Sequence, residues 1–325
     1  MKYVLTGATG HVGNNVLRYL LEQKEKVKIL VRREKDESFA GLDVEVCVGD
    51  LLNEDYLNAN IESDSVVIHS AGIVDITKGN EKLMYDTNVV ATKKIVDECI
   101  RKKAKLIYIG STDAIYKESK DEKVSEPVDY YPEYFKDNYA VTKATASKYV
   151  LEKLNKKELR GCIIIPSAVI GPNDFKISSV GQAFLDCINH KMMGRMKGGY
   201  NFIDARDLAQ AIYQASINSN SNQYLITGTD VSIDEMIKSI YKHLGRNKLP
   251  LYFPLWLVYI GAIFAPMFAK IKGTKPIFTI KMVKTVNGNH NYDNTLAKSE
   301  LGLKIRPYEE SISDSLDWLK EYKTK

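Results

Sequence analysis

An apolar strand pattern that runs directly into three evenly spaced glycines constrains the fold of this chain more than any other feature. Residues 2–6 (Lys-Tyr-Val-Leu-Thr) are mostly apolar or β-branched, which predicts a buried strand. Gly7, Gly10 and Gly13 follow at once, and apolar residues then recur at helical spacing over 16–21. The segment therefore predicts a strand, a tight glycine turn and a helix in direct succession.

This succession is the arrangement that binds the pyrophosphate of a dinucleotide. The first glycine permits the tight turn, the second lets the backbone approach the phosphates, and the third lets the helix pack closely on the strand. The helix N-terminus adds free N–H groups and the positive end of its dipole. We therefore predict a cofactor site along the turn, and a glycine loop without a ligand is the alternative. Its expected contacts are Gly7, Thr9, Gly10, His11, Val12 and Gly13.

A second predicted strand, residues 26–31, ends in two arginines and not in a carboxylate. In dinucleotide-binding folds an Asp or Glu near this place binds the ribose 2′-hydroxyl of NAD, whereas an Arg accommodates the 2′-phosphate of NADP. A guanidinium pairs with phosphate through two parallel hydrogen bonds. The pattern favours NADP, with NAD as the alternative, and makes Arg32 the first contact and Arg33 the second. Two solvated arginines without a ligand are the competing interpretation.

Strand and helix patterns alternate along the first half of the chain. Strands are predicted at 44–48, 65–69, 105–109 and 161–166, and helices at 83–102 and 136–153. Such alternation predicts an α/β fold, a doubly wound parallel sheet of the Rossmann type with a smaller C-terminal substrate-binding region. We expect 1–170 to form the dinucleotide-binding domain, with 200–230 returning to it, and 171–199 with 231–325 to form the smaller region.

The composition is typical of a soluble enzyme and argues against several other classes. The 325 residues are 44% hydrophobic and 27% charged, and the net charge of +5 arises from interspersed charges, so no nucleic-acid partner is expected. The four cysteines have no metal-ligand spacing, so we predict reduced thiols, no metal site and a cytoplasmic location. No signal peptide is expected, because a strand pattern begins almost at once.

Tyr139 and Lys143 lie four residues apart in the predicted helix 136–153, which places both head groups on one face. A free tyrosine has a pKa of about 10 and is a poor acid–base group at neutral pH. A nearby ammonium favours the phenolate and lowers that pKa toward the working range. The spacing therefore predicts a proton-transfer pair, with two solvated helix residues as the alternative.

Together these motifs resemble the extended short-chain dehydrogenases/reductases, which include nucleotide-sugar epimerases, dihydroflavonol reductases and 3β-hydroxysteroid dehydrogenases. The resemblance spans about residues 1–230 and rests on segments 6–13, 50–51, 69–72, 86–92, 111–112, 139–143, 166–172 and 202–209. It implies an adenine contact at Asp50 with Leu51 and contacts along the middle of the cofactor at Ala71 and Gly72. Beside the nicotinamide it implies Pro166, Ser167 and Ala168.

The resemblance also implies the catalytic groups. Tyr139 is expected to be the general acid/base, Lys143 to hold the nicotinamide ribose, and Asn88 to organise the site. The third hydroxyl is expected from Thr112 and not from Ser111, because Thr112 lies four residues before an aromatic residue. Arg206 departs from the residues commoner at its position, and a homodimer through the helices that carry Asn88 and Tyr139 is expected by resemblance alone.

The run 249–269 has no charged residue and is long enough by count to suggest a membrane span. Three prolines and a glycine interrupt it, so the predicted helix is only 255–265, too short to cross about 30 Å of hydrocarbon. An apolar lid or pocket wall is favoured. Peripheral membrane contact through 249–275, aided by three lysines, is the alternative to it. Both interpretations favour an apolar substrate.

The sequence thus predicts an NADP-dependent oxidoreductase that moves a hydride between nicotinamide and the carbonyl or hydroxyl of a small, apolar molecule. Two alternatives remain, a nucleotide-sugar epimerase or dehydratase that retains NAD, and a dinucleotide-binding sensor without catalysis. Arg32 and the apolar run argue against the epimerase, and the intact Tyr139 and Lys143 argue against the sensor.

Overall fold

The computed structural model describes residues 1–74, 79–119, 121–192, 194–272, 283 and 285–324, and its core is a parallel sheet. Seven strands pair in the order β3-β2-β1-β4-β5-β6-β10, all in parallel, and the order reverses between β1 and β4. This confirms the predicted doubly wound sheet. The strands are β1 (Lys2–Thr6), β2 (Lys26–Val31), β3 (Glu45–Val48), β4 (Val66–His69), β5 (Lys105–Ile109), β6 (Arg160–Pro166) and β10 (Gln223–Ile226).

Helices cover both faces of this sheet, because side chains alternate along each buried strand. In β1, Tyr3 and Leu5 belong to one hydrophobic core and Val4 to the other. The first core contains α1 (His11–Glu22) and α7 (Ala205–Ile217). The second contains α2 (Glu54–Asn60), α4 (Ala91–Lys102) and α5 (Asn138–Asn155).

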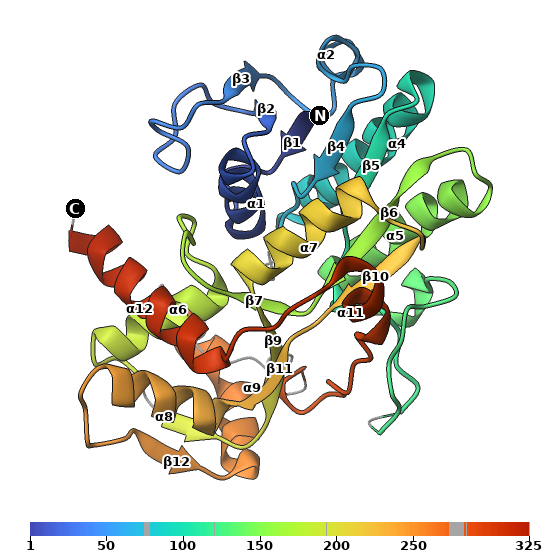
Figure 1. The fold of residues 1–325 in the computed structure, drawn as a ribbon. Helices are drawn as coiled ribbons and strands as arrows, with labels where there is room; N and C mark the ends of the chain where they lie inside the picture. Colours follow the sequence, from blue (N-terminus) through green and yellow to red (C-terminus); the bar gives the residue numbers. More distant parts are fainter. Residues whose placement is uncertain (75–78, 120, 193, 273–282, 284, 325) are drawn as a thin grey trace.

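A smaller unit lies beside the main sheet, in the lower part of Figure 1. Its three-stranded sheet has the order β11-β9-β7, and β8 pairs with β12 in a separate ribbon. Its own core is formed with α6 (Ser179–Ile188), α8 (Ile233–His243) and α12 (Tyr308–Thr324). The strands are β7 (Ala168–Ile170), β8 (Gly194–Met196), β9 (Gly199–Asp204), β11 (Thr229–Ser232) and β12 (Leu251–Phe253).

The division between the two units differs in detail from the predicted boundaries. β7 pairs with β9, so the smaller unit already includes residues 168–170. The segment around α11 (Thr295–Leu301) returns to the main unit, where Ala297 and Leu301 are buried in the core beneath α1 and α7. The chain therefore crosses between the units more often than the sequence patterns indicate.

Two predicted helices have a different form in the structure. The continuous helix expected at 83–102 is α3 (Glu81–Tyr85), a π-helical turn η1 (Asp86–Val90) and then α4. The short helix expected at 255–265 is α9 (Leu255–Lys272), which continues through Pro266, so the prediction that the proline ends this helix was wrong. A proline in a helix removes one backbone hydrogen bond and destabilises the helix by about 3 kcal/mol. This cost can kink the helix without ending it. Among the described residues, none of the helices has the length and apolar character to cross a membrane.

Candidate active site

The glycine turn between β1 and α1 has the backbone geometry that the sequence predicts. Gly7 has φ +76°, and a Cβ there would lie 2.6 Å from the Ala71 nitrogen. A Cβ on Gly13 would lie 2.2 Å from the Gly7 carbonyl oxygen. The positive φ of Gly7 requires a residue that tolerates a left-handed conformation. The distance at Gly13 shows how closely α1 approaches the turn. A phosphate can therefore reach the N-terminus of α1, where no side chain caps the helix.

Three cations gather at the outer side of this turn. Lys176, from the loop after β7, donates a hydrogen bond to the Thr9 hydroxyl. Burial lowers the pKa of Lys176, and the charges of Arg32 and Arg33 lower it further, against the opposing effect of Asp36. Like charges held this close repel one another unless an anion lies between them. Arg32 and Arg33 are exposed at the end of β2, so both can reach such an anion.

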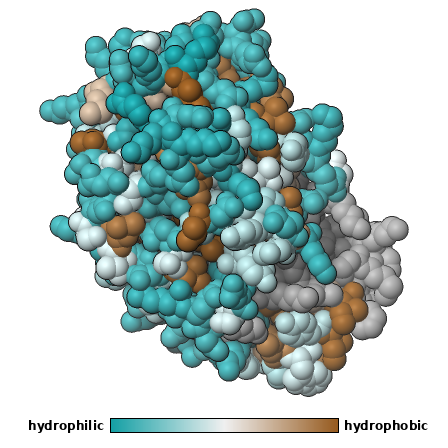
Figure 2. All heavy atoms as spheres, turned by 90° about the vertical axis from the view of Figure 1, so that its right-hand side faces the viewer, coloured by the Kyte–Doolittle hydropathy of each residue, from teal (hydrophilic) through white to brown (hydrophobic). Residues whose placement is uncertain are grey.

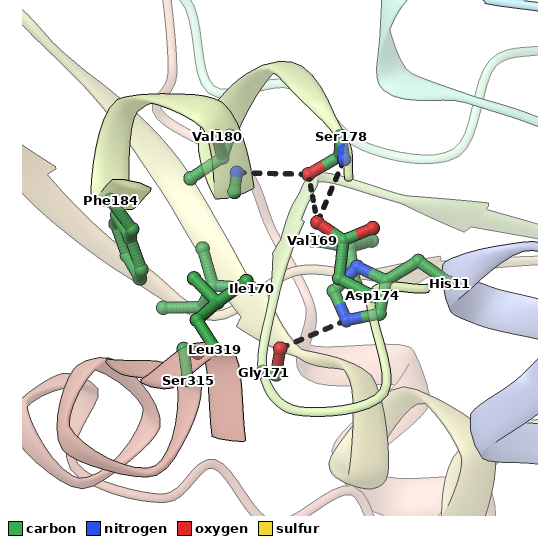
Figure 3. A pocket seen from close by; sticks show the side chains of 11 residues that line it. His11, Val169, Ile170, Gly171, Asp174, Ser178, Val180, Phe184, Ser315 and Leu319 are labelled. Carbon is green, nitrogen blue, oxygen red and sulfur yellow. Dashed lines mark hydrogen bonds between the residues drawn. The ribbon is translucent and has the colours of Figure 1, made fainter. Parts of the chain in front are cut away.

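His11 occupies the first position of α1 but is directed away from the turn. Its Nε2 lies 3.1 Å from the carbonyl oxygens of both Gly171 and Pro172. Figure 3 shows this ring at the edge of a small cavity lined also by Asp174 and Phe184. The side chain thus ties α1 to the smaller unit, and of His11 only the backbone remains available to a phosphate. Val12 packs against the core with its side chain.

The predicted proton-transfer pair lies in the first turns of α5, at the carboxyl end of the sheet. Lys143 is 6% exposed, and its Nζ donates a 2.7 Å hydrogen bond to the carbonyl oxygen of Ile109, the last residue of β5. The ammonium also lies 5.1 Å from the centroid of the Tyr108 ring. Burial lowers the pKa of Lys143 to about 8. The protein therefore holds a desolvated cation beside the end of β5.

The surroundings of Tyr139 differ from the expectation drawn from the Lys143 ammonium. Burial raises the pKa of Tyr139, the Asp113 carboxylate raises it further, and a hydrogen bond with the Ser111 side chain lowers it. The Ser111 hydroxyl accepts from the Asp113 backbone N–H, so its own proton is available to donate. Lowering of the Tyr139 pKa by Lys143 is not observed, because the ammonium is directed at Ile109.

Asn88 lies in the π-helical turn η1 and holds the loop that follows β4. Its side chain donates to the Ile73 carbonyl oxygen at 3.0 Å and accepts from the Ile73 N–H at 2.8 Å. It also donates to Thr142, the residue before Lys143, at 3.1 Å. A Cβ on Gly72 would lie 3.3 Å from the Asn88 Oδ1 and 3.6 Å from the Lys143 Nζ. The structure thus brings Gly72, Asn88 and Lys143 together, and π-helical turns often occur at functional sites.

A buried chain of hydrogen bonds connects this turn to β1. The Thr92 hydroxyl donates to the Asn88 carbonyl oxygen at 2.7 Å, so it accepts from His69 Nε2 at 2.9 Å. His69 Nδ1 therefore accepts from the Thr6 hydroxyl at 2.7 Å, and Thr6 in turn accepts from the Ala71 N–H. Burial and then the Lys143 charge lower the pKa of His69 to about 3. The neutral imidazole therefore connects the end of β1, where the glycine turn begins, to η1 and α4.

Thr112 is directed at a polar wall that the sequence analysis did not identify. A hydrogen bond with Thr112 opposes the burial that raises the pKa of Tyr292 to about 12. Lys117 Nζ donates to the Tyr292 hydroxyl at 2.7 Å and to the Asn289 carbonyl oxygen at 2.8 Å. The Tyr200 and His290 rings lie 5.7 Å apart in the same wall. Segments 112–117 and 289–292 lie far apart in the sequence, so no local pattern connects them.

The remaining predicted cofactor contacts lie along the carboxyl edge of the sheet. Asp50 is exposed after β3, and its carboxylate accepts from the Leu52 N–H at 2.9 Å, so Leu51 lies within a tight turn. Pro166 ends β6 and Ala168 begins β7. Between them the buried Ser167 hydroxyl has no hydrogen-bond partner among the described residues. A buried hydroxyl without a partner, at the same carboxyl edge of the sheet as the glycine turn, fits a bound nicotinamide dinucleotide.

Comparison with known proteins agrees with this geometry. The family model described as "NAD dependent epimerase/dehydratase family" matches residues 3–226. "Sterol demethylase protein B" of Methylococcus capsulatus is 27% identical over 326 residues, which cover 99% of each chain. "3beta-hydroxysteroid-dehydrogenase/decarboxylase isoform 1" of Arabidopsis thaliana is 24% identical over 292 residues, 84% of this chain and 66% of that protein.

The solved structures agree in fold. The crystal structure of gox2253 is 25% identical, covers 98% of each chain and superposes with a TM-score of 0.84. The seven-stranded parallel sheet, the glycine turn and the family match cover the same part of the chain. The chain therefore belongs to the NAD-dependent epimerase/dehydratase family, has the extended short-chain dehydrogenase/reductase fold, and is an NAD(P)-dependent enzyme that acts on CH–OH or C=O groups.

Proposed function

We propose that the protein is an NADP-dependent oxidoreductase that interconverts a secondary alcohol and a ketone on a small, apolar, sterol-like molecule. The observation that carries this proposal is the contact between the Tyr139 hydroxyl, in the first turn of α5, and the Ser111 side chain, which follows β5. The buried Lys143 ammonium lies one helical turn further along α5. This arrangement supplies a proton acceptor, a hydrogen-bond donor for the substrate oxygen and a fixed positive charge.

The protein's part in the reaction follows from these positions. When bound, the nicotinamide supplies the hydride acceptor for alcohol oxidation and the hydride donor for ketone reduction. Tyr139 takes the hydroxyl proton as the alcohol becomes a carbonyl and returns it in the reverse direction. Ser111 holds the substrate oxygen, and the buried Lys143 ammonium holds the ribose next to the nicotinamide. Asn88 acts indirectly, because it positions the Ile73 backbone and Thr142.

The preference for NADP rests on the cations around Thr9. Arg32 and Arg33 lower the pKa of Lys176 although the Asp36 carboxylate opposes them, and position 32 carries no carboxylate for a ribose 2′-hydroxyl. A 2′-phosphate at the end of β2 neutralises this cluster. The site thus favours the cofactor with the extra phosphate.

The class of substrate rests on the relatives and on the apolar C-terminal region. Two relatives have names that refer to sterols or steroids. Neither Arg32 nor the uncharged run at 249–269 suits an epimerase that retains NAD and binds a nucleotide sugar. These observations support a hydrophobic alcohol with one polar end, which the hydroxyls of Ser111 and Tyr139 receive.

The cofactor assignment predicts that NADPH binds more tightly than NADH and that Arg32→Asp reverses this order. Loss of a charge-assisted contact to phosphate should raise the NADPH dissociation constant about 10- to 100-fold, while NADH binding improves. Titration followed by nicotinamide fluorescence measures both constants, and oxidation of a panel of hydroxysterols with NADP⁺ and NAD⁺ tests the reaction.

Arg160→Asp is the matched control, because Arg160 begins β6 at the opposite, amino end of the sheet. It should leave both constants unchanged. Protein that is purified with NAD already bound, or that prefers NADH irrespective of residue 32, contradicts the proposal and favours the epimerase alternative.

A second prediction distinguishes the two neighbouring hydroxyls. The resemblance favours Thr112 as the third catalytic group, whereas the geometry favours Ser111, whose side chain bonds with Tyr139. Ser111→Ala should lower kcat about 10- to 100-fold, and Thr112→Val should lower it less than about fivefold, since Thr112 bonds with Tyr292. Steady-state kinetics of both variants decide the matter, and the opposite ranking supports Thr112.

A further inference from the structure

The segment formed by β12 and α9 leaves an apolar surface without a covering element among the described residues. Trp256, Ile260 and Ile263 are 64%, 45% and 58% exposed. They are spaced i, i+4 and i+7, so they lie along one face of α9, whereas Ala262 on the opposite face is 1% exposed. Leu251 and Tyr252 of β12 are also exposed. Figure 2 shows apolar side chains at the lower end of the molecule.

The part of the sequence that contains β12 and α9 is strongly one-sided in charge. From Met236 to Tyr292 the chain has 57 residues with nine lysines or arginines and no aspartate or glutamate. The rest of the chain retains 37 of the 46 basic residues against all 41 acidic ones, so its net charge is negative. The nine basic residues are Lys238, Lys242, Arg246, Lys248, Lys270, Lys272, Lys275, Lys281 and Lys284.

Basic side chains from a neighbouring strand add to this charge. β8 pairs in parallel with β12, and the Arg195 guanidinium lies 5.4 Å from the centroid of the Tyr252 ring. Lys197, directly after β8, is exposed, as are Lys242 and Lys248 before β12. Asp234 pairs with both Arg195 and Lys238, so the exposed Lys197, Lys242 and Lys248 are the groups available to an external partner.

We propose that β12 and α9 dock the protein onto the surface of an anionic lipid bilayer, with α9 lying in the plane of the interface. An exposed apolar stripe that includes a tryptophan, flanked by basic residues, is the pattern of interfacial helices. A second copy of the chain is a poor occupant, because dimerisation through this face would bring two strongly basic segments together. This inference is independent of the reaction proposed above.

Lipid vesicles provide a direct test, because the protein has two tryptophans and one lies in the apolar stripe. In the Trp318→Phe variant, Trp256 is the single tryptophan. Its emission should shift to shorter wavelength, and the protein should sediment, with vesicles of phosphatidylcholine containing phosphatidylglycerol. With phosphatidylcholine alone, binding should be weaker by about fivefold for each basic side chain engaged, and added salt should reduce the difference.

Two variants separate the apolar and electrostatic contributions. Ile260→Glu with Ile263→Glu should weaken vesicle binding at least about tenfold, since both charges would enter the interface. Lys242→Glu with Lys248→Glu should remove most of the preference for anionic lipid. Val128→Glu is the control, because Val128 is 92% exposed outside this segment. Circular dichroism and NADPH titration verify that each variant is folded.

Three results would overturn the proposal. The first is that the protein does not sediment with either type of vesicle. It could instead sediment without a change in Trp256 emission, which would place the contact on another surface. Finally, sedimentation equilibrium could show a dimer that the Ile260→Glu, Ile263→Glu variant loses, with no vesicle binding, which would make this face a subunit interface.

Discussion

Replacing Tyr139 with phenylalanine should lower kcat about 10³-fold or more in both directions while NADPH binding changes less than about threefold. General acid–base groups contribute roughly 10²- to 10⁴-fold, and this variant removes the oxygen that accepts the proton without altering the packing of the ring. The effect should be confined to kcat. The affinity for the cofactor should change little, because Lys143 and the glycine turn, which bind it, are unaltered. Steady-state kinetics and fluorescence titration measure the two quantities separately.

The pH dependence follows from the direction of the Tyr139 pKa shift. Burial and then Asp113 raise the pKa of Tyr139, so its phenol is protonated at neutral pH. Alcohol oxidation needs the deprotonated form, and its kcat/KM should therefore rise with pH through the neutral range and beyond. Ketone reduction needs the protonated form and should show no loss until the alkaline range.

Tyr134→Phe is the matched control, because Tyr134 is 57% exposed in the 3-10 turn just before α5. It should retain full activity and the same pH profile. A Tyr139→Phe enzyme with more than about a tenth of the normal kcat contradicts the assignment and makes another group the proton acceptor.

The glycine turn and the strands β1 to β6 were predictable from sequence because their signals are local. Gly7 was expected to make the tight turn and Gly13 to allow close packing, and the φ of +76° at Gly7 and the 2.2 Å approach at Gly13 confirm both roles. A buried strand reveals itself through a run of apolar residues, and a glycine constrains only its immediate neighbours. The doubly wound sheet then follows from alternation of such elements.

The catalytic details were less predictable because they depend on contacts across the fold. A π-helical turn at Asp86–Val90 differs from an α-helix by one residue in hydrogen-bond register, and no periodic pattern marks it. Ser111 and Thr112 are neighbours, and the direction of the following 3-10 turn decides which hydroxyl lies at Tyr139. Lys117 and Tyr292 meet across 175 residues. No sequence motif marks the loop that contains Lys176, so its contact with Thr9 could not be predicted either.

Lys143→Met should inactivate the enzyme and yet stabilise the cofactor-free protein. Burial lowers the pKa of this lysine from its ordinary 10.5 to about 8, which corresponds to roughly 3 kcal/mol of destabilisation at neutral pH. Methionine fills a similar volume without a charge, although it leaves the Ile109 carbonyl without its donor at a cost of about 1–2 kcal/mol. The net gain should be about 1–2 kcal/mol, or a few degrees in Tm. Denaturant unfolding measures it, and kcat should fall at least about 100-fold.

The pH dependence of this gain identifies its cause. Below pH 8 the lysine is protonated in both the folded and unfolded states, so the wild type carries the full penalty of a buried charge. Between about pH 8 and 10.5 the folded protein releases the proton while the unfolded chain retains it, so the wild type gains stability as the pH rises. The difference between the two proteins should therefore narrow across this window. Lys148→Met, at an exposed lysine of the same helix, should show no such narrowing. A Lys143→Met protein that is less stable than the wild type at pH 7, with a difference independent of pH, shows that the fold stabilises the ammonium and contradicts the prediction.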